Sequence, residues 1–239
     1  MIQFFAPEIE TTLQLPESDS RHAVRVLRLQ PGATIEVIDG KGHRFTCVLV
    51  DGHSKHASVE IVERYDMPLP WPQEIVAAVA PTKHIDRMEW MVEKLTEIGV
   101  NRIIPVLCQR SERKELRRDR LEKIAVSAMK QSLKATLPVV EEMTPLSNVI
   151  TRFDRMQRFV GYCDDQTPRV DLACAYRPMQ SAAILIGPEG DFTPAEIAET
   201  LRLGWQPVIL GPCRLRTETA AVSAVDTLHI LDRHSACLK

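Results

Sequence analysis

The sequence lacks the features that mark several large protein classes. Its six cysteines form no CxxC pair and are scattered along the chain, at positions 47, 108, 163, 174, 213 and 237. Zinc sites use closely paired ligands and disulfide frameworks are typical of small secreted chains, so we expect reduced thiols and no metal. His53 and His56 are close in sequence, but no cysteine or carboxylate group accompanies them. We interpret them as part of a polar turn.

Long hydrophobic runs are also missing. No stretch of about 18 apolar residues occurs, so the sequence predicts no transmembrane helix. The first residues have neither the basic segment nor the apolar core of a signal peptide, and we expect a cytoplasmic protein. Neither GxGxxG nor a phosphate-binding Gly-Lys-Ser/Thr sequence is found. The formal net charge of -2 argues against attraction of the whole chain to nucleic acid, but not against a local basic surface.

The chain does contain two glycine loops, each placed after a short apolar segment. Residues 184–186 and 207–210 are expected strands, and each is followed by a glycine and a polar loop that leads into a helix. Ligands of open α/β sheets bind outside the carboxyl ends of the strands, so we expect both loops to face one pocket. In the first loop, Thr193 is expected to cap the next helix, with Pro194 at its first position.

Residues 1 to about 66 have the pattern of a small β domain. Asp39-Gly40 indicates a tight turn between two strands. A proline-rich segment, Met67–Pro72, then forbids both helix and central strand and predicts a domain boundary. The expected strands of this first domain are residues 33–38, 45–50 and 57–62.

A short helix is predicted over residues 20–29. The spacing places Arg21, Arg25 and Arg28 on one face of that helix. Those arginines either project into solvent or contact phosphates at the edge of a small barrel, and the spacing does not decide between the two.

After residue 74 the pattern alternates between strand and helix, which predicts a parallel sheet covered by helices on both faces. Gly99 is expected to end the first of these helices. The expected strands are residues 75–80, 102–107, 158–162, 182–186 and 207–210, and the expected helices are residues 85–98, about 119–135, and 217–232.

Basic side chains concentrate in residues 108–134, where nine Lys or Arg residues accompany four acids. Charge runs are usually solvated helix faces. A basic segment in an otherwise acidic chain is also the pattern expected for binding a polyanion, and phosphate contact is the interpretation we favour. No aromatic residues interleave with it, so base stacking is not indicated.

The two loops, read together, resemble one enzyme class. IGPEGDFTPAEI and LGPCRLRTETA resemble the SPOUT-class RNA methyltransferases, and within them the RsmE family, which methylates N3 of a uridine in 16S rRNA. SRHAVRVLR, EKLTEIGV, Arg110-Ser111 and Gln131-Ser132 also match that family. The chain departs from its pattern at Asp191, where the family has glycine, at Cys213-Arg214, where it has Arg-Ile, and at Lys134, where it has arginine.

The resemblance implies an α/β fold, with a SPOUT-type parallel sheet and a C-terminal trefoil knot preceded by a small PUA-like β-barrel domain. The domains would be residues 1–68, which bind RNA, and 72–239, which carry the methyltransferase and its cofactor-binding knot. It also implies a homodimer that acts on 16S rRNA, within the assembled small ribosomal subunit, without metal or membrane. The apolar stripe of residues 222–231 fits a dimer interface and core burial equally well.

The implied cofactor is S-adenosylmethionine, bound by main-chain groups and apolar enclosure. The implied cofactor-binding residues are Leu185, Ile186, Gly187, Glu189, Gly190, Leu210, Gly211, Leu215 and Thr219. The implied RNA-binding residues are Arg21, His22, Arg25, Arg28, Lys83, Lys94, Arg110, Lys114, Gln131 and Lys134.

Two residues are predicted to be catalytic. The uracil N3 must lose a proton, and Arg216 is the cation expected to stabilise the developing anion. Glu218 would orient Arg216 or accept the proton. The alternative for Arg216 is a purely structural ion pair with Glu218 or Glu189. Two other functions also stay open, namely methylation of a ribose 2′-hydroxyl or another base, and a ribosome-assembly RNA-binding protein without catalysis.

Overall fold

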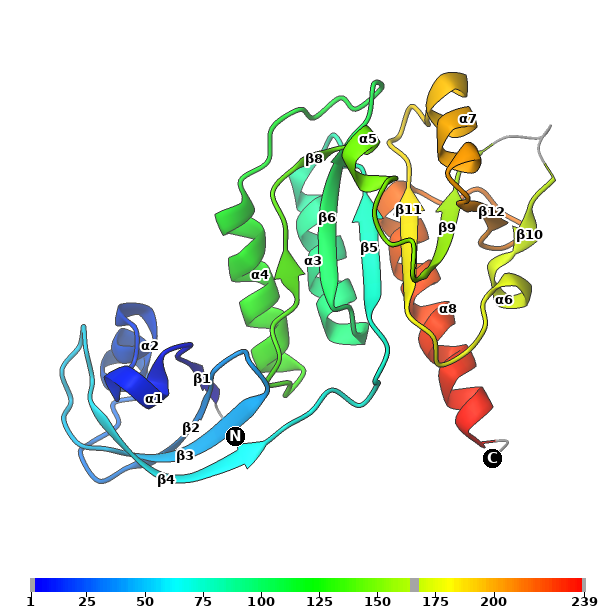
Figure 1. Cartoon of the computed structure of the whole chain (residues 1–239). Coiled ribbons are helices and arrows are strands. Elements are labelled where there is room, and N and C mark those ends of the chain that lie inside the picture. Colours follow the sequence, from blue (N-terminus) through cyan, green and yellow to red (C-terminus); the bar gives the residue numbers. More distant parts are fainter. Residues whose placement is uncertain (1–2, 164–167, 238–239) are drawn as a thin grey trace. The chain divides into compact units, whose positions relative to one another are not determined.

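The computed structural model describes residues 3–163 and 168–237, and the chain forms two compact units (Figure 1). The first unit consists of Met1–Pro70 and Val126–Leu137. The second consists of Trp71–Ala125 and Pro138–Lys239.

The first unit is built on a four-stranded sheet with the order β1-β2-β3-β4. β1 is parallel to β2, whereas the other neighbours are antiparallel. The three predicted strands are confirmed with shifted ends, and β1 was not predicted. Phe4, Val37, Phe45 and Leu49 form part of the apolar core on one face. The strands are β1 Gln3–Phe5, β2 Thr34–Ile38, β3 His43–Leu49 and β4 Val59–Asp66.

The predicted helix over residues 20–29 is confirmed in part, because the helical segment covers residues 17–26 and is not a single regular α-helix. The chain instead forms α2 (Glu17–Arg21), preceded by α1 (Ile9–Thr12), and then one wider turn, η1 (His22–Val26). In that turn the Leu27 amide donates to the His22 carbonyl five residues back, at 2.9 Å. Arg28 then adopts a left-handed conformation with φ of 54°. The wider turn and this residue end the helical periodicity that was predicted to align Arg28 with Arg21 and Arg25.

The last part of α4 (Arg118–Gln131) belongs to the first unit. The helix ends four residues earlier than predicted, because Leu133 is left-handed, with φ of 56°, and the Lys134 amide turns back to the Met129 carbonyl. Met129 packs with Ile38 and Ala135 in a small buried cluster. The ammonium of Lys130 pairs with the Asp19 carboxylate at 2.7 Å.

The second unit contains an eight-stranded sheet whose described pairings are all parallel. Its order is β10-β12-β9-β11-β5-β6-β7, with β8 paired to β6. The predicted parallel α/β architecture is therefore confirmed. The strands are β5 Ile75–Val79, β6 Arg102–Leu107, β7 Val139–Val140, β8 Thr144–Pro145, β9 Gln157–Gly161, β10 Val170–Asp171, β11 Ala182–Ile186 and β12 Gln206–Ile209.

Helices cover both faces of this sheet, as expected. α3 and α8 pack against each other on one face, where α8 also contacts β5 and β11 (Figure 1). On the other face, α5 and α7 surround a core that includes the buried Trp205. Because strand side chains alternate between faces, β5 contributes Val76 and Ala78 to that second core. The helices are α3 Ile85–Ile98, α5 Leu146–Val149, α6 Leu172–Ala175, α7 Pro194–Arg202 and α8 Thr217–Cys237.

The predicted helix signals are confirmed at two ends. Gly99 caps α3 with φ of 132°, a conformation that favours glycine. Thr193 caps α7 in a capping box with Glu196, and Pro194 is the first helical residue. Far along α8, the buried Asp232 accepts hydrogen bonds from the Tyr176 hydroxyl and the Met179 amide, which fixes that helix to the segment before β11.

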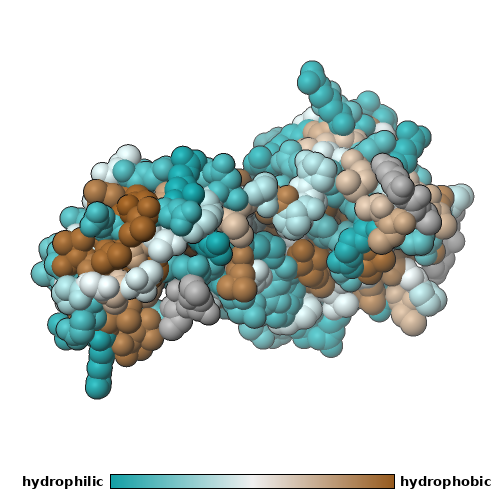
Figure 2. All heavy atoms as spheres, turned by 90° about the horizontal axis from the view of Figure 1, so that it is seen from below, coloured by the Kyte–Doolittle hydropathy of each residue, from teal (hydrophilic) through white to brown (hydrophobic). Residues whose placement is uncertain are grey.

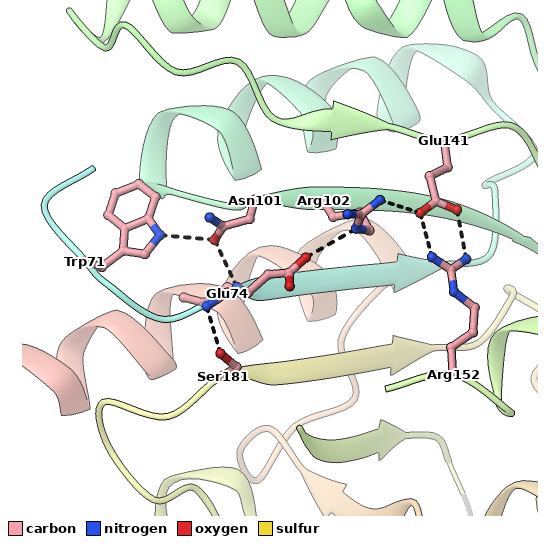
Figure 3. A network of polar contacts seen from close by, with 8 residues as sticks. Trp71, Glu74, Asn101, Arg102, Glu141, Arg152 and Ser181 are labelled. Atoms are coloured by element: carbon pink, nitrogen blue, oxygen red, sulfur yellow. Dashed lines mark hydrogen bonds and ion pairs between the residues drawn. The ribbon is translucent and has the colours of Figure 1, made fainter. Parts of the chain in front are cut away.

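A polar network joins the beginnings of β5 and β6 (Figure 3). Asn101 accepts hydrogen bonds from the Trp71 indole and the Ile75 amide through the same oxygen. Arg102 pairs with Glu74 at 3.3 Å and with Glu141 at 2.9 Å. Arg152 binds both oxygens of Glu141, at 2.7 and 2.8 Å.

The surface carries hydrophobic patches between hydrophilic ones (Figure 2). Val26, Val62, Trp90 and Ile230 are among the exposed large hydrophobic residues. None of the helices in the described part of the chain has the length and apolar character needed to cross a membrane.

Candidate active site

A cavity of about 990 Å³ lies at the carboxyl ends of β9, β11 and β12. The loop after β11 lines it from Ile186 to Glu189, and the loop after β12 lines it from Leu210 to Thr217. The end of β9 adds Gly161, Tyr162 and Cys163. The prediction that both glycine loops face one pocket is therefore confirmed.

Glycines let the backbone form much of this wall. Gly211 has φ of 126°, and a Cβ atom added there would meet nothing within 4 Å. At Gly187, an added Cβ would lie 2.7 Å from the ring of Phe192. Both positions therefore need glycine, the first for its conformation and the second for space. The recess beside Gly211 is open to a ligand that reads main-chain groups.

Asp191, where the resemblance predicts glycine, has two structural roles at the cavity wall. Its φ of 60° is left-handed, a conformation that aspartate tolerates better than most residues. Its carboxylate accepts hydrogen bonds from the Cys163 amide at 2.9 Å and from the Phe192 amide at 2.8 Å. The side chain thereby ties the end of β9 to the loop after β11, which a glycine could not do.

Arg216 lines the cavity immediately before α8 and its side chain is exposed. No ion pair links it to Glu218, Glu189 or any other acid among the described residues. The alternative of a structural ion pair is therefore not what the geometry shows. A guanidinium without a protein partner keeps its charge available for an anionic ligand.

Glu218 is buried, with 8% of its side chain exposed, and it does not line the cavity. Its nearest cation is Arg87, whose Nε lies 3.8 Å from the Glu218 Oε1. The same guanidinium donates through Nη1 to the Glu189 Oε1 at 3.3 Å. Arg87, which also lines the cavity, therefore bridges two carboxylates.

Arg87 was not predicted from the sequence. It lies in the first turn of α3, after the carboxyl end of β5, and it lines the cavity. The rule that drew attention to the two glycine loops also applies here, since β5 pairs with β11 and ends at the same edge of the sheet. Extending that rule to every strand end would have found Arg87.

The remaining predicted cofactor-binding residues divide into two groups. Leu185 packs in the apolar core, and Gly190 and Thr219 are exposed residues outside the cavity lining. Those that line the cavity are Ile186, Gly187, Glu189, Leu210, Gly211 and Leu215.

In the second unit, most predicted RNA-binding cations are already bound within the protein. Lys83 pairs with an acid, Glu112, at 2.9 Å, and Lys94 pairs with its neighbours Glu93 and Glu97. Arg110 donates to the carbonyls of Gly190 and Phe192, both at 3.2 Å, and so supports the loop after β11. Lys114 is exposed and has no partner in the described part of the chain.

Ion pairs also neutralise much of the basic segment around the start of α4. Arg117 pairs with Asp119, Arg118 with Glu122, and Arg120 with Glu89. Local charge excess in the sequence therefore overstates the charge that this surface presents.

The predicted RNA-binding residues of the first unit are more accessible. Arg21, Arg25 and Arg28 are exposed and form no ion pair within residues 3–163 and 168–237. His22 packs edge-on against the Phe4 ring with centroids 6.0 Å apart. Gln131 is exposed at the end of α4, and the Lys134 ammonium donates to the Ser132 hydroxyl at 3.1 Å.

Comparisons with known proteins agree with this architecture. A family described as an RNA methyltransferase domain matches residues 69–229, and an RNA methyltransferase PUA domain matches residues 15–62. A probable rRNA-methyltransferase from Porphyromonas gingivalis is 41% identical, with a TM-score of 0.93 and full coverage of both chains.

Two further relatives carry a more specific name. Ribosomal RNA small subunit methyltransferase E of Aquifex aeolicus (strain VF5) is 29% identical over 90% of this chain and 93% of its own. The protein of the same name from Neisseria gonorrhoeae, solved with S-adenosyl methionine, is 28% identical, with a TM-score of 0.84 over 97% of this chain and 98% of its own.

These comparisons confirm the SPOUT-type α/β fold with an N-terminal PUA-like domain, while the knot stays a prediction. The chain belongs to the RNA methyltransferase domain family, of the RsmE type.

Proposed function

We propose that the chain transfers a methyl group from S-adenosylmethionine to N3 of a specific uridine in the decoding region of 16S rRNA. The observation that carries this proposal is the exposed, unpaired Arg216 at a cavity walled by two glycine loops. The names of the relatives support the coarser part, methylation of small-subunit rRNA with this cofactor. The predicted action on the assembled subunit as a homodimer is part of the same proposal.

The cavity fits the proposed cofactor. Main-chain groups beside Gly187 and Gly211 are approachable, because neither residue has a side chain to cover them. Ile186, Leu210 and Leu215 supply apolar walls for an adenine ring and a methionine chain. When bound, S-adenosylmethionine supplies an electrophilic methyl group on a positively charged sulfur.

Arg216 has the direct role in this mechanism. When N3 of uracil loses its proton, negative charge spreads onto the two carbonyl oxygens, and a preorganised guanidinium stabilises that charge. Because no carboxylate of residues 3–163 or 168–237 forms an ion pair with Arg216, its charge is available to the reacting base. Glu218 is buried beside Arg87, so we assign it the role of orienting Arg87 and not of contacting the base directly.

The first experiment is methyl transfer from labelled S-adenosylmethionine to 16S rRNA that lacks the modification. Free RNA and intact small subunits are offered separately, and the product is digested to nucleosides. We expect label in 3-methyluridine, with small subunits as the better substrate. Label in a 2′-O-methyl nucleoside would contradict the proposed chemistry, and label in neither, with cofactor bound, would contradict the proposed RNA target.

The role of Arg216 is tested with Arg216→Ala. We expect its transfer rate to fall by about 10²–10³-fold, the loss typical of removing one charge-stabilising donor, while its cofactor dissociation constant changes little. Arg202→Ala, on the exposed face of α7 and paired with Glu199, is the matched control and should retain activity. Equal loss of cofactor binding and transfer in Arg216→Ala would contradict the assignment.

A further inference from the structure

Three charged side chains from distant parts of the chain meet beside the cavity, and two of them, Arg87 and Glu189, line it. Arg87 comes from the first turn of α3, Glu189 from the loop after β11, and Glu218 from the first turn of α8. Arg87 touches both carboxylates, and no other ion pair to either occurs among the described residues. The three therefore form a chain of contacts, with the arginine in the middle.

Burial differs along this chain of contacts. Glu218 is almost entirely buried, and its Oε2 has no hydrogen-bond partner in the described part of the protein. A buried carboxylate requires a nearby cation, and Arg87 supplies it. The side chain of Glu189 is 30% exposed and lines the cavity. The interaction thus runs from the protein interior, through Arg87, to a carboxylate that a ligand can reach.

Arg87 and Arg216, two of the four arginines that line the cavity, have different electrostatic roles. Arg87 lies between two acids, so its charge is compensated within the protein, whereas Arg216 forms no ion pair with any acid that the structure describes. Arg87 is therefore suited to hold a group in place and not to bind a ligand anion. What it holds at the cavity is Oε1 of Glu189, and no donor from the described part of the chain occupies Oε2 of the same carboxylate.

Asp191 is the other acid that lines the cavity, and both of its carboxylate oxygens are occupied by hydrogen bonds from backbone amides. Its two oxygens accept hydrogen bonds from the amides of Phe192 and Cys163. Glu189 is thus the cavity carboxylate that keeps an oxygen without a hydrogen-bond donor among the described residues.

We infer that Glu189 is the catalytic base of the transfer and that Arg87, backed by Glu218, is its positioning residue. The inference rests on the proposed function, since it requires a base nitrogen that carries a proton. Oε2 of Glu189 takes the proton of N3–H, and the electron pair of that bond forms the new bond from nitrogen to the methyl carbon. The pair of the broken carbon–sulfur bond stays on sulfur, and Glu189 later releases the proton to solvent.

The test measures single-turnover methyl transfer and the cofactor dissociation constant, with the rRNA substrate that the unaltered protein accepts. We expect Glu189→Gln to lower the transfer rate by about 10²–10⁴-fold, the usual contribution of a general base, and to leave the cofactor dissociation constant within about threefold. A large loss of cofactor affinity with an unchanged transfer rate would overturn the inference, because Glu189 would then be a binding residue.

The positioning role of Arg87 is tested by combining substitutions. Arg87→Ala should slow transfer, and Arg87→Lys should restore part of the rate, because lysine keeps the charge but not the forked geometry. The double variant Arg87→Ala/Glu189→Gln should be no slower than Glu189→Gln alone, since Arg87 acts through Glu189. Losses that multiply in the double variant would overturn the positioning role.

Two controls separate this inference from the proposed function. If the unaltered protein forms no 3-methyluridine, the proposed function fails before any variant is compared. If it does, and Glu189→Gln transfers at the normal rate, the catalytic base is wrong and the proposed function stands. Arg87→Lys covers the case in which Arg87→Ala does not fold, because it retains the cation between the two carboxylates.

Discussion

At the scale of single residues, Asp191 shows how a departure from the expected family pattern is accommodated. Glycine, which the resemblance predicts at this position, would suit a left-handed backbone, and Asp191 adopts that backbone with φ of 60°. The carboxylate compensates for the less favourable conformation by capping the amides of Cys163 and Phe192. A sequence pattern shows the substitution, but only the structure shows the two hydrogen bonds that replace the conformational freedom of glycine.

Substitutions at Asp191 separate the effect of its hydrogen bonds from the effect of its left-handed backbone. Asp191→Gly loses both caps but tolerates the left-handed backbone, whereas Asp191→Ala loses both caps and adds backbone strain of about 1 kcal/mol. We expect stability against urea to decrease from the unaltered protein to Asp191→Gly and further to Asp191→Ala. Equal stability of the glycine and alanine variants would show that the backbone conformation costs nothing here.

Two arginines of the cavity show what the sequence can and cannot predict. Arg216 was predicted because a loop motif contains it, whereas Arg87 was missed because its partner Glu189 is 102 positions away. Helix periodicity placed Arg28 beside Arg25, but a wider turn and a left-handed residue intervene. Both failures concern information that is absent from local spacing.

At the scale of elements, regular periodicity predicted the long helices and buried strands well. The predicted bounds of α3, β6 and β11 are those of the structure, because α3 is long and the two strands are strongly apolar, and glycine follows both α3 and β11. The elements that were missed, such as β1, α5 and β7, have two to four residues, too few to show a period.

The polar network that joins β5, β6 and Arg152 predicts how Glu141 contributes to stability. The hydrogen bonds from Arg152, followed by those from Arg102, hold the pKa of Glu141 below its usual value despite partial burial. A carboxylate with a lowered pKa in the folded state stabilises that state above its unfolded pKa, and this stabilisation disappears as the pH falls through the folded value. Glu141→Gln should therefore lower the free energy of unfolding near neutral pH, by about 2 kcal/mol.

The pH dependence provides the check. The difference between Glu141→Gln and the unaltered protein, measured by urea unfolding, should be full above about pH 5 and shrink towards acid pH. Glu199→Gln removes an exposed ion pair on α7 and should have a much smaller effect at any pH. A difference that persists unchanged into acid would mean that packing, and not the charge of Glu141, accounts for the loss.

At the scale of the whole molecule, the chain passes between the two units more than once. The proline-rich segment marks one crossing between the two units, but Val126–Leu137 returns to the first unit in the middle of a helix. No proline, glycine cluster or composition change announces that return, since α4 continues through residue 126 without interruption. Sequence reasoning finds boundaries through broken patterns, so an unbroken helix shared by two units escapes it.

The six cysteines lie in both units and two of them line the cavity, so their rates of alkylation probe all three places. Burial raises the pKa of Cys47 to about 11 and that of Cys108 to about 12, and a thiol reacts as its thiolate. These two should resist alkylation at pH 8 until the protein is unfolded. The exposed thiols should react readily in the folded protein; they are Cys163, Cys174, Cys213 and Cys237.

Cofactor binding should then divide the exposed thiols into two pairs. Cys163 and Cys213 line the cavity, whereas Cys174 and Cys237 do not. With S-adenosylmethionine at 100 times its dissociation constant, only about 1% of the sites stay open, so alkylation of the cavity pair should slow by on the order of 100-fold. Mass spectrometry of the labelled peptides measures each rate, with Cys174 and Cys237 as internal controls. Unchanged alkylation rates at Cys163 and Cys213, with the cofactor bound, would show that the cofactor does not bind at the two glycine loops.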